Sequence, residues 1–137
     1  MARPASAETI VLPGEVDLQA AIDRSADGDR LVLQGAHHGP IRITRKLTLE
    51  GKPGAILLGT GEGSVITVIV PGVVVRDLTI RGSGRNLERM DAGVFVEKSA
   101  AGALVEENRI EGNLYGIYLH GAANAVARKN EIVGIDV

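Results

Sequence analysis

The phrases LTLEG (47–51), LTIRG (78–82), NRIEG (108–112) and NEIVG (130–134) decide the fold. Their starts lie 31, 30 and 22 residues apart, and each phrase has an apolar third residue and a final glycine. Recurrence at such intervals is typical of a chain wound into stacked units. Apolar and polar residues alternate within each unit, which is the period of strands. The repeats therefore predict an all-β fold, a parallel β-helix, which is right-handed by the general rule for parallel crossovers.

Longer phrases predict the register of the stacked units. The segments VRDLTI (75–80), VEENRI (105–110) and ARKNEI (127–132) align, with apolar residues at their first and sixth positions. We expect these positions to point inward, so that Val75, Val105 and Ala127 share one column. The fourth position holds Asn108 and Asn130, whose side-chain amides can bond to the neighbouring coil as a structural ladder.

Composition limits the classes of function. The 137 residues suit one domain, 45% of them are hydrophobic, and only three are aromatic. A net charge of −2 and the absence of Trp argue against a nucleic-acid partner. No apolar run is long enough to span a bilayer, and the lack of Cys excludes thiolate chemistry.

The two ends of the chain carry separate expectations. Residues 1–15 are interpreted as a leader, because Ala5-Ser6-Ala7 matches the cleavage site of an export signal, with a disordered leader as the alternative. Residues 16–26 predict an amphipathic capping helix with Asp17 as its N-cap. Coils are expected over 30–137, and the chain stops soon after NEIVG, so we expect further C-terminal coils to be missing.

The repeats and the capping helix resemble one family, the nitrous oxide reductase maturation proteins called NosD. The resemblance rests on LTLEGKPGA (47–55), LTIRGSGRNLE (78–88), AGVFVEKSA (92–100) and the run from Asn108 to Gly134, and it covers the N-terminal portion of a usual member. It implies a periplasmic, non-enzymatic β-helix protein of the carbohydrate-binding and sugar-hydrolase (CASH) type. Such a protein works with ABC transporter components and a copper chaperone or nitrous oxide reductase, in denitrification.

The resemblance also implies copper as a possible cofactor. Copper is bound by His and Met, and the candidate ligands are His37, His38, His120 and Met90. Adjacent histidines on a strand point to opposite sides, so His37 and His38 could share one ion only within a turn. Solvated surface residues are the alternative reading of all four.

Two further readings concern partners and substrates. The polar insert SGRNLERMDA (83–92) should leave the solenoid as a loop, and it offers Arg85, Glu88, Arg89 and Asp91 to a docking partner; a merely solvated loop is the alternative. Because β-helices also host polysaccharide-active enzymes, a carbohydrate-binding or carbohydrate-cleaving protein is the alternative function. Its candidate carboxylates are Asp91, Glu97, Glu106, Glu107 and Glu111.

Overall fold

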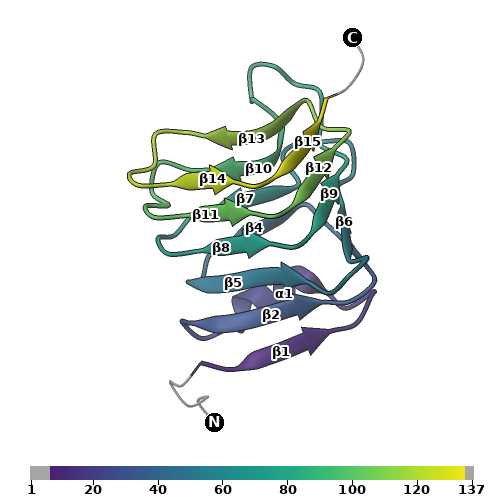
Figure 1. Cartoon of the computed structure of the whole chain (residues 1–137), viewed down its shortest axis with the longest axis vertical. Coiled ribbons are helices and arrows are strands. Elements are labelled where there is room, and N and C mark those ends of the chain that lie inside the picture. The colour runs from purple at the N-terminus through teal and green to yellow at the C-terminus, as the bar shows by residue number, and fades with distance from the viewer. Residues whose placement is uncertain (1–6, 135–137) are drawn as a thin grey trace.

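The computed structural model describes residues 7–134, which form a right-handed parallel β-helix. Its fifteen strands stack in three sheets, and all their pairings are parallel (Figure 1). The six-stranded sheet contains β1 (Thr9–Leu12), β2 (Asp29–Leu33), β5 (Leu47–Gly51), β8 (Val74–Arg76), β11 (Leu104–Glu106) and β14 (Val126–Arg128). The five-stranded sheet contains β3 (Ala36–His38), β6 (Ile56–Leu58), β9 (Thr79–Arg81), β12 (Arg109–Glu111) and β15 (Glu131–Val133). The four-stranded sheet contains β4 (Ile41–Ile43), β7 (Ile66–Val68), β10 (Ala92–Val96) and β13 (Tyr115–Leu119).

Aliphatic side chains stack in register inside the solenoid. In the six-stranded sheet the inward column runs Ile10, Leu31, Leu49, Val75, Val105 and Ala127. The expected alignment of Val75, Val105 and Ala127 is therefore confirmed. Leu31, Leu49 and Val75 are fully buried, so each coil covers the apolar surface of the one before it.

The N-terminal helix α1 spans Leu18–Asp23, which is shorter than the predicted range 16–26. Asp17 is its N-cap, as expected, and accepts a hydrogen bond from Ala20 N. Leu18, Ala21 and Ile22 are buried against the first coil. The helix ends at Asp23 with Arg24 as its C-cap. Beyond it, Ser25 Oγ donates a hydrogen bond to Ala21 O.

The interpretation of residues 1–15 as a leader is wrong for residues 9–12. These residues form β1, which pairs in parallel with β2, and Leu12 is buried in the core. Ile10 and Leu12 alternate with Thr9 and Val11, so the segment has the period of a half-buried strand. Residues 1–6, which include the Ala-Ser-Ala motif, lie outside the described residues.

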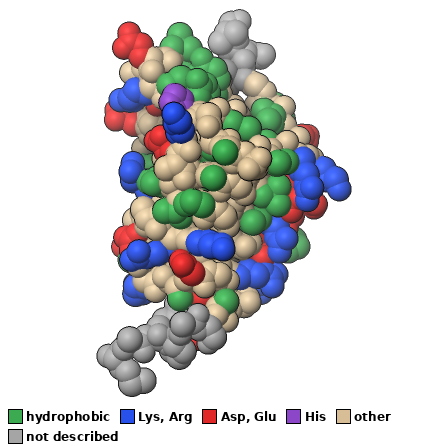
Figure 2. Space-filling view, turned by 90° about the vertical axis from the view of Figure 1, so that its left-hand side faces the viewer, with side chains coloured by type: hydrophobic (Ala, Val, Ile, Leu, Met, Phe, Trp, Pro, Cys, Tyr) green, Lys and Arg blue, Asp and Glu red, His purple; other side chains and the backbone are tan. Residues whose placement is uncertain are grey.

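The turns stack in register as well as the strands. Where the four-stranded sheet leads into the six-stranded sheet, Gly72, Gly102 and Asn124 all have positive φ. Gly72 N donates to Ala101 O at 3.0 Å and Gly102 N donates to Ala123 O at 2.8 Å, so one turn supports the next. Figure 2 shows apolar side chains gathered on this side of the molecule, with charged ones mainly along its margins.

A second stack of turns joins the six-stranded sheet to the five-stranded sheet. Asp77, Glu107 and Lys129 follow β8, β11 and β14, and their φ angles are 58°, 56° and 53°. The left-handed conformation bends the chain sharply, and it holds these three charged side chains outside the core.

No helix in the described part of the chain is long and apolar enough to cross a membrane.

Candidate functional site

The outer face of the four-stranded sheet carries an aromatic stack. Arg42, Thr67, Phe95 and Tyr118 occupy one register line across β4, β7, β10 and β13. The rings of Phe95 and Tyr118 stack with centroids 5.2 Å apart and planes inclined by 10°. His120 lies beside them, with its ring centroid 5.7 Å from Phe95 and 5.9 Å from Tyr118.

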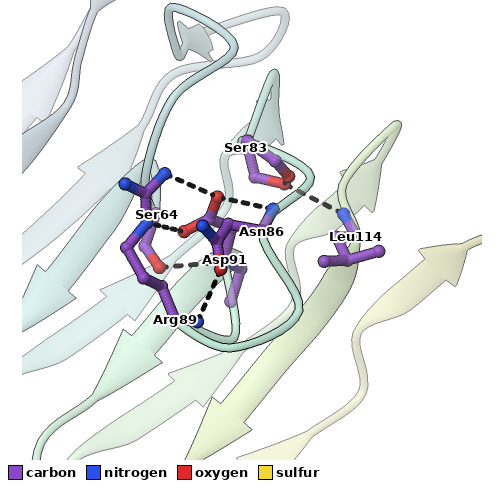
Figure 3. Close-up of polar contacts among 8 residues, drawn as sticks. Ser64, Ser83, Asn86, Arg89, Asp91 and Leu114 are labelled. Carbon is purple, nitrogen blue, oxygen red and sulfur yellow. Dashed lines mark hydrogen bonds and ion pairs between the residues drawn. The ribbon is translucent and has the colours of Figure 1, made fainter.

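The loop 83–92 stands beside this face and is held by a buried carboxylate (Figure 3). Asp91 is only 1% exposed, and its Oδ2 accepts a hydrogen bond from Asn86 N at 3.0 Å. Arg89 Nη2 lies 3.3 Å from the same oxygen. Asn86 Oδ1 accepts from Arg89 N at 2.9 Å. The side chains of Asn86 and Asp91 therefore connect the two ends of the turn 86–91. The loop is therefore a fixed structure.

Two serines fasten this loop to the neighbouring coils. Ala92 N donates to Ser64 Oγ at 3.0 Å, and Leu114 N donates to Ser83 Oγ at 2.9 Å. A Cβ on Gly84 would lie 2.2 Å from Asp91 Oδ2, so only glycine leaves room for the carboxylate.

The buried position of Asp91 corrects one sequence prediction. Its carboxylate is enclosed by the loop, so it positions the loop and is not offered to a partner. Arg85, Glu88 and Arg89 are exposed as expected, and Leu87 at the tip is 65% exposed. Between the loop and the sheet lies a shallow depression of about 190 Å³, lined by Arg42, Gly63, Ser64, Thr67, Arg89, Asp91, Phe95 and Glu97.

The candidate copper ligands do not meet. His37 and His38 lie on β3 and point to opposite sides, His120 follows β13 in another sheet, and Met90 lies in the loop. His37 is fully buried in the inward column of the five-stranded sheet, next to Leu57. Among the described residues no three His, Cys, Asp or Glu side chains are close enough to hold a metal ion. Within residues 7–134, the four candidate ligands therefore do not form a copper site with one another.

His37 occupies a position that an aliphatic side chain would fill. Its Nε2 donates to Leu12 O at 3.0 Å, but its buried Nδ1 has no partner. Leu12 O also accepts from Gln34 N at 2.9 Å, so it stays satisfied without the imidazole. We expect His37→Leu to be neutral or to raise the free energy of unfolding by about 1 kcal/mol, as measured by urea unfolding at pH 7. A loss of stability on this substitution would show that the imidazole has a structural role that its contacts do not reveal.

Asparagine side chains link successive coils at the corner between the six-stranded and five-stranded sheets. Asn108 Oδ1 accepts from Leu78 N at 3.1 Å, and Asn108 Nδ2 donates to Val75 O at 3.1 Å. Asn130 repeats both bonds one coil later, accepting from Asn108 N and donating to Val105 O. The structure thus brings Asn108 and Asn130 together in a ladder.

Asn113, which the sequence analysis did not single out, does the same at the next corner. It accepts from Ser83 N at 3.0 Å and donates to Ile80 O at 3.1 Å. The phrase NRIEGN contains both asparagines, and its second one follows a glycine turn. This placement is a signal that could have identified Asn113.

Charged side chains of opposite sign alternate along the six-stranded sheet. Glu50, Arg76, Glu106 and Arg128 are register neighbours on β5, β8, β11 and β14. Arg76 Nη2 lies 3.1 Å from Glu50, and Arg128 Nε lies 2.8 Å from Glu106. The negative charges of the Glu50 and Glu106 carboxylates are thereby compensated by arginines, as expected for cross-strand pairing.

Glu50 makes the stability of the fold depend on pH. The hydrogen bond from Arg30 lowers the pKa of the Glu50 carboxyl from its ordinary value of 4.5; burial opposes this effect and Arg76 reinforces it. Because the folded-state pKa is depressed, the stabilisation is present above pH 4.5 and is lost as the pH falls through the folded-state value. We expect urea unfolding from pH 7 to pH 3 to show a stability difference between wild type and Glu50→Gln that shrinks below pH 4.5. A difference that stays constant over this range would contradict the assignment.

The candidate catalytic carboxylates do not converge on one site. Glu106 is bonded to Arg128, Glu111 is bonded to Arg109, and Asp91 is held in its loop. Glu97 lines the depression, whereas Glu107 lies at the corner beyond β11. Asp91 also lines the depression, but its carboxylate is only 1% exposed and accepts from Asn86 N, so it does not form an open pair with Glu97.

Comparison with known proteins confirms the resemblance to NosD. The chain is 38% identical over 111 residues to the probable ABC transporter binding protein NosD of Pseudomonas aeruginosa, covering 80% of this chain and 26% of that protein. It is 31% identical over 100 residues to the protein of the same name in Stutzerimonas stutzeri, covering 73% and 23%. The chain thus spans about a quarter of the length of these curated relatives. No protein-family model matches.

Solved structures show the same fold. A pectin methylesterase variant in complex with a hexasaccharide superposes with a TM-score of 0.65 at 17% identity, covering 80% of this chain and 45% of that one. A second pectin methylesterase complex gives a TM-score of 0.63 at the same identity. At this identity the likeness concerns the β-helix alone.

Proposed function

We propose, from its similarity to the NosD proteins, that this chain is a non-catalytic coil segment of a periplasmic accessory protein that works with an ABC transporter. The accessory protein would take part in maturation of the copper centres of nitrous oxide reductase. The observation that carries the proposal is the 38% identity to Pseudomonas aeruginosa NosD over 80% of the chain. That relative and the Stutzerimonas stutzeri protein are both named as probable ABC transporter binding proteins.

A role in protein contacts fits the side chains better than a role in carrying metal. The four candidate ligands are dispersed over three places in the fold, and His37 is enclosed in the core. Copper would then be handled by a partner, while this segment supplies a rigid outer surface.

Catalysis receives no support from the arrangement of carboxylates. Retaining glycosidases need two carboxyl groups about 5 Å apart and inverting enzymes need them about 6.5–9.5 Å apart, both facing the substrate. Here Glu50, Glu106 and Glu111 each bind an arginine instead. We therefore propose a non-enzymatic role, with polysaccharide binding as the alternative that a fold of this kind leaves open.

The loop 83–92 is the part of this surface that we propose contacts a partner protein. Its backbone is fixed by Asp91 and Asn86, so docking would cost little conformational entropy. The loop presents Leu87 between Arg85 and Glu88, all exposed. An apolar residue with charged neighbours suits a contact that buries one anchor and keeps a polar rim.

A chimeric protein tests the proposed function. The matched segment of Pseudomonas aeruginosa NosD is replaced by the matching part of this chain, in a strain that lacks NosD. We expect the chimera to restore reduction of nitrous oxide, and Leu87→Ser in the chimera to reduce it without loss of folded protein. A chimera that accumulates in folded form but restores no activity would refute the assignment. If the chimera is active and Leu87→Ser has no effect, only the docking role of the loop is refuted.

A further inference from the structure

We propose that the depression between the loop 83–92 and the four-stranded sheet is a slot for one aromatic side chain of the partner protein. The inference rests on the proposed role of this surface in protein contacts, and it names the chemistry of the partner residue. The slot is a gap in the aromatic stack of the sheet, at the place that Thr67 occupies.

A short side chain interrupts the register line on the outer face of the sheet. From β4 to β13 the line runs Arg42, Thr67, Phe95 and Tyr118. Tyr118 stacks on one face of the Phe95 ring with the planes inclined by only 10°, so the other face of this ring is turned toward β7. The residue of β7 in that line is Thr67, and the depression lies where a longer side chain would stand.

The spacing of the coils suits one inserted ring. Neighbouring strands lie about 4.8 Å apart, so a ring at the level of Thr67 would lie about 5 Å from Phe95 on one side and from Arg42 on the other. Aromatic rings stack with centroids about 4.5–7 Å apart, and a guanidinium attracts a ring face within about 6 Å. Arg42 is exposed and its guanidinium makes no ion pair within residues 7–134, so it can cover the second face of the ring.

The walls of the slot are held in place by hydrogen bonds. The backbone N–H of Arg42 donates to Gln19 Oε1 at 2.8 Å, and the Arg42 carbonyl accepts from Gln19 Nε2 at 3.0 Å, so the helix α1 fixes this wall. On the loop side, Ser64 accepts from the backbone of the loop, and Arg89 lies 3.3 Å from Asp91 (Figure 3). Little ordering of the chain is therefore needed when a side chain enters.

The size and the charge of the slot indicate a neutral ring as the occupant. The volume is about 190 Å³, whereas sites for whole small ligands take about 300–1,000 Å³, so the slot holds a single side chain. The charged groups along it are Arg42, Arg89, Asp91 and Glu97, so no excess of either sign favours an ionised residue. A sugar fits less well, because the rings of the stack face each other and do not turn a flat platform outward.

Titration of the ¹⁵N-labelled chain with N-acetyltryptophanamide tests the slot by itself. We expect saturable shifts of the amide signals of residues 42, 67 and 95, with binding of N-acetylleucinamide weaker by about fivefold or more. Arg42→Gln should weaken binding of the tryptophan probe about two- to fivefold, because the cation is lost. Thr67→Tyr should abolish this binding, since its own ring fills the slot, and should melt higher than the wild type by stacking on Phe95.

Thr48→Tyr is the matched control, because Thr48 is likewise half-buried but lies on the outer face of the six-stranded sheet. It should leave binding of the tryptophan probe unchanged. In the NosD chimera, Thr67→Tyr should lower the reduction of nitrous oxide and Thr48→Tyr should not.

Several results would overturn the proposal: no saturable shift at residues 42, 67 and 95, equal binding of the leucine probe, or undiminished binding to Thr67→Tyr. Shifts of the same signals by a galacturonate trisaccharide, but not by the tryptophan probe, would make a sugar the occupant and would also overturn it. Full activity of the chimera with Thr67→Tyr would exclude the slot from the partner contact. In that case, or if the probe does not bind, an active chimera leaves the proposed function standing without the slot.

Discussion

Replacing Gly51 with alanine is expected to abolish the cooperative fold or to lower the free energy of unfolding by about 3 kcal/mol or more. Gly51 ends β5, where the backbone of the next coil passes close by. A Cβ there would lie 2.4 Å from Asp77 O, 2.8 Å from Leu78 Cδ2 and 2.9 Å from Ala55 Cβ. The carbonyl belongs to a turn fixed by two coils, so it cannot move aside without separating them.

Gly134 is the matched control for this substitution. It ends the equivalent phrase NEIVG, and among the described residues, its chain neighbours aside, no heavy atom lies within 4 Å of the position of its Cβ. Chemical denaturation of both variants, followed by far-UV circular dichroism, should show a large decrease in the free energy of unfolding for Gly51→Ala and almost none for Gly134→Ala. Equal stability of the two variants would mean that the coils are not packed as closely as described.

Asn108→Ala is the second substitution with a large expected effect. Asn108 is buried, and its amide satisfies Leu78 N and Val75 O, while its Nδ2 also lies 3.1 Å from Asn130 Oδ1. Removing the amide leaves a backbone donor and a backbone acceptor with no side-chain partner at the corner. An unsatisfied buried polar group costs about 1–3 kcal/mol, so we expect a loss of about 2–4 kcal/mol in urea unfolding.

Asn130→Ala provides the comparison, because Asn130 makes the same two bonds one coil later. Asn130 is half-buried on the last described coil, where water can replace its amide. The expected loss is therefore smaller than for Asn108→Ala. A larger loss for Asn130→Ala would show that burial does not set the strength of the ladder.

The repeats are sufficient to predict the architecture because each unit contains the residues that stack on its neighbours. Inward residues recur at fixed places, so the register of Val75, Val105 and Ala127 followed from alignment alone. The strand β1 was missed because it lacks the glycine-ended phrase of the later coils, although Ile10 and Leu12 alternate as a strand should. The burial of His37 is predicted neither by its interpretation as a copper ligand nor by the alternative of a solvated residue, because a histidine in an aliphatic column departs from the pattern of its neighbours.

The site was less predictable, since it depends on contacts between segments far apart in the chain. The insert 83–92 was recognised as a loop from its polarity, but the burial of Asp91 depends on how Asn86 and Arg89 fold back on it. Likewise, the stack of Phe95 on Tyr118 requires the register of β10 with β13. Such contacts appear only when both coils are in place.

Engineered cysteine pairs test the stacking of the coils most directly, because the sequence contains no cysteine of its own. Thr79 and Arg109 are register partners on β9 and β12, and Glu111 lies two residues further along β12. Neighbouring strands lie about 4.8 Å apart, within the range of Cα separations that a disulfide spans. The offset pair Thr79 and Glu111 would be about 8 Å apart, beyond that range. The account predicts that Thr79→Cys with Arg109→Cys oxidises to a disulfide within the folded monomer, whereas Thr79→Cys with Glu111→Cys does not. Rapid oxidation of the offset pair together with failure of the aligned pair would contradict the parallel register on which every coil depends.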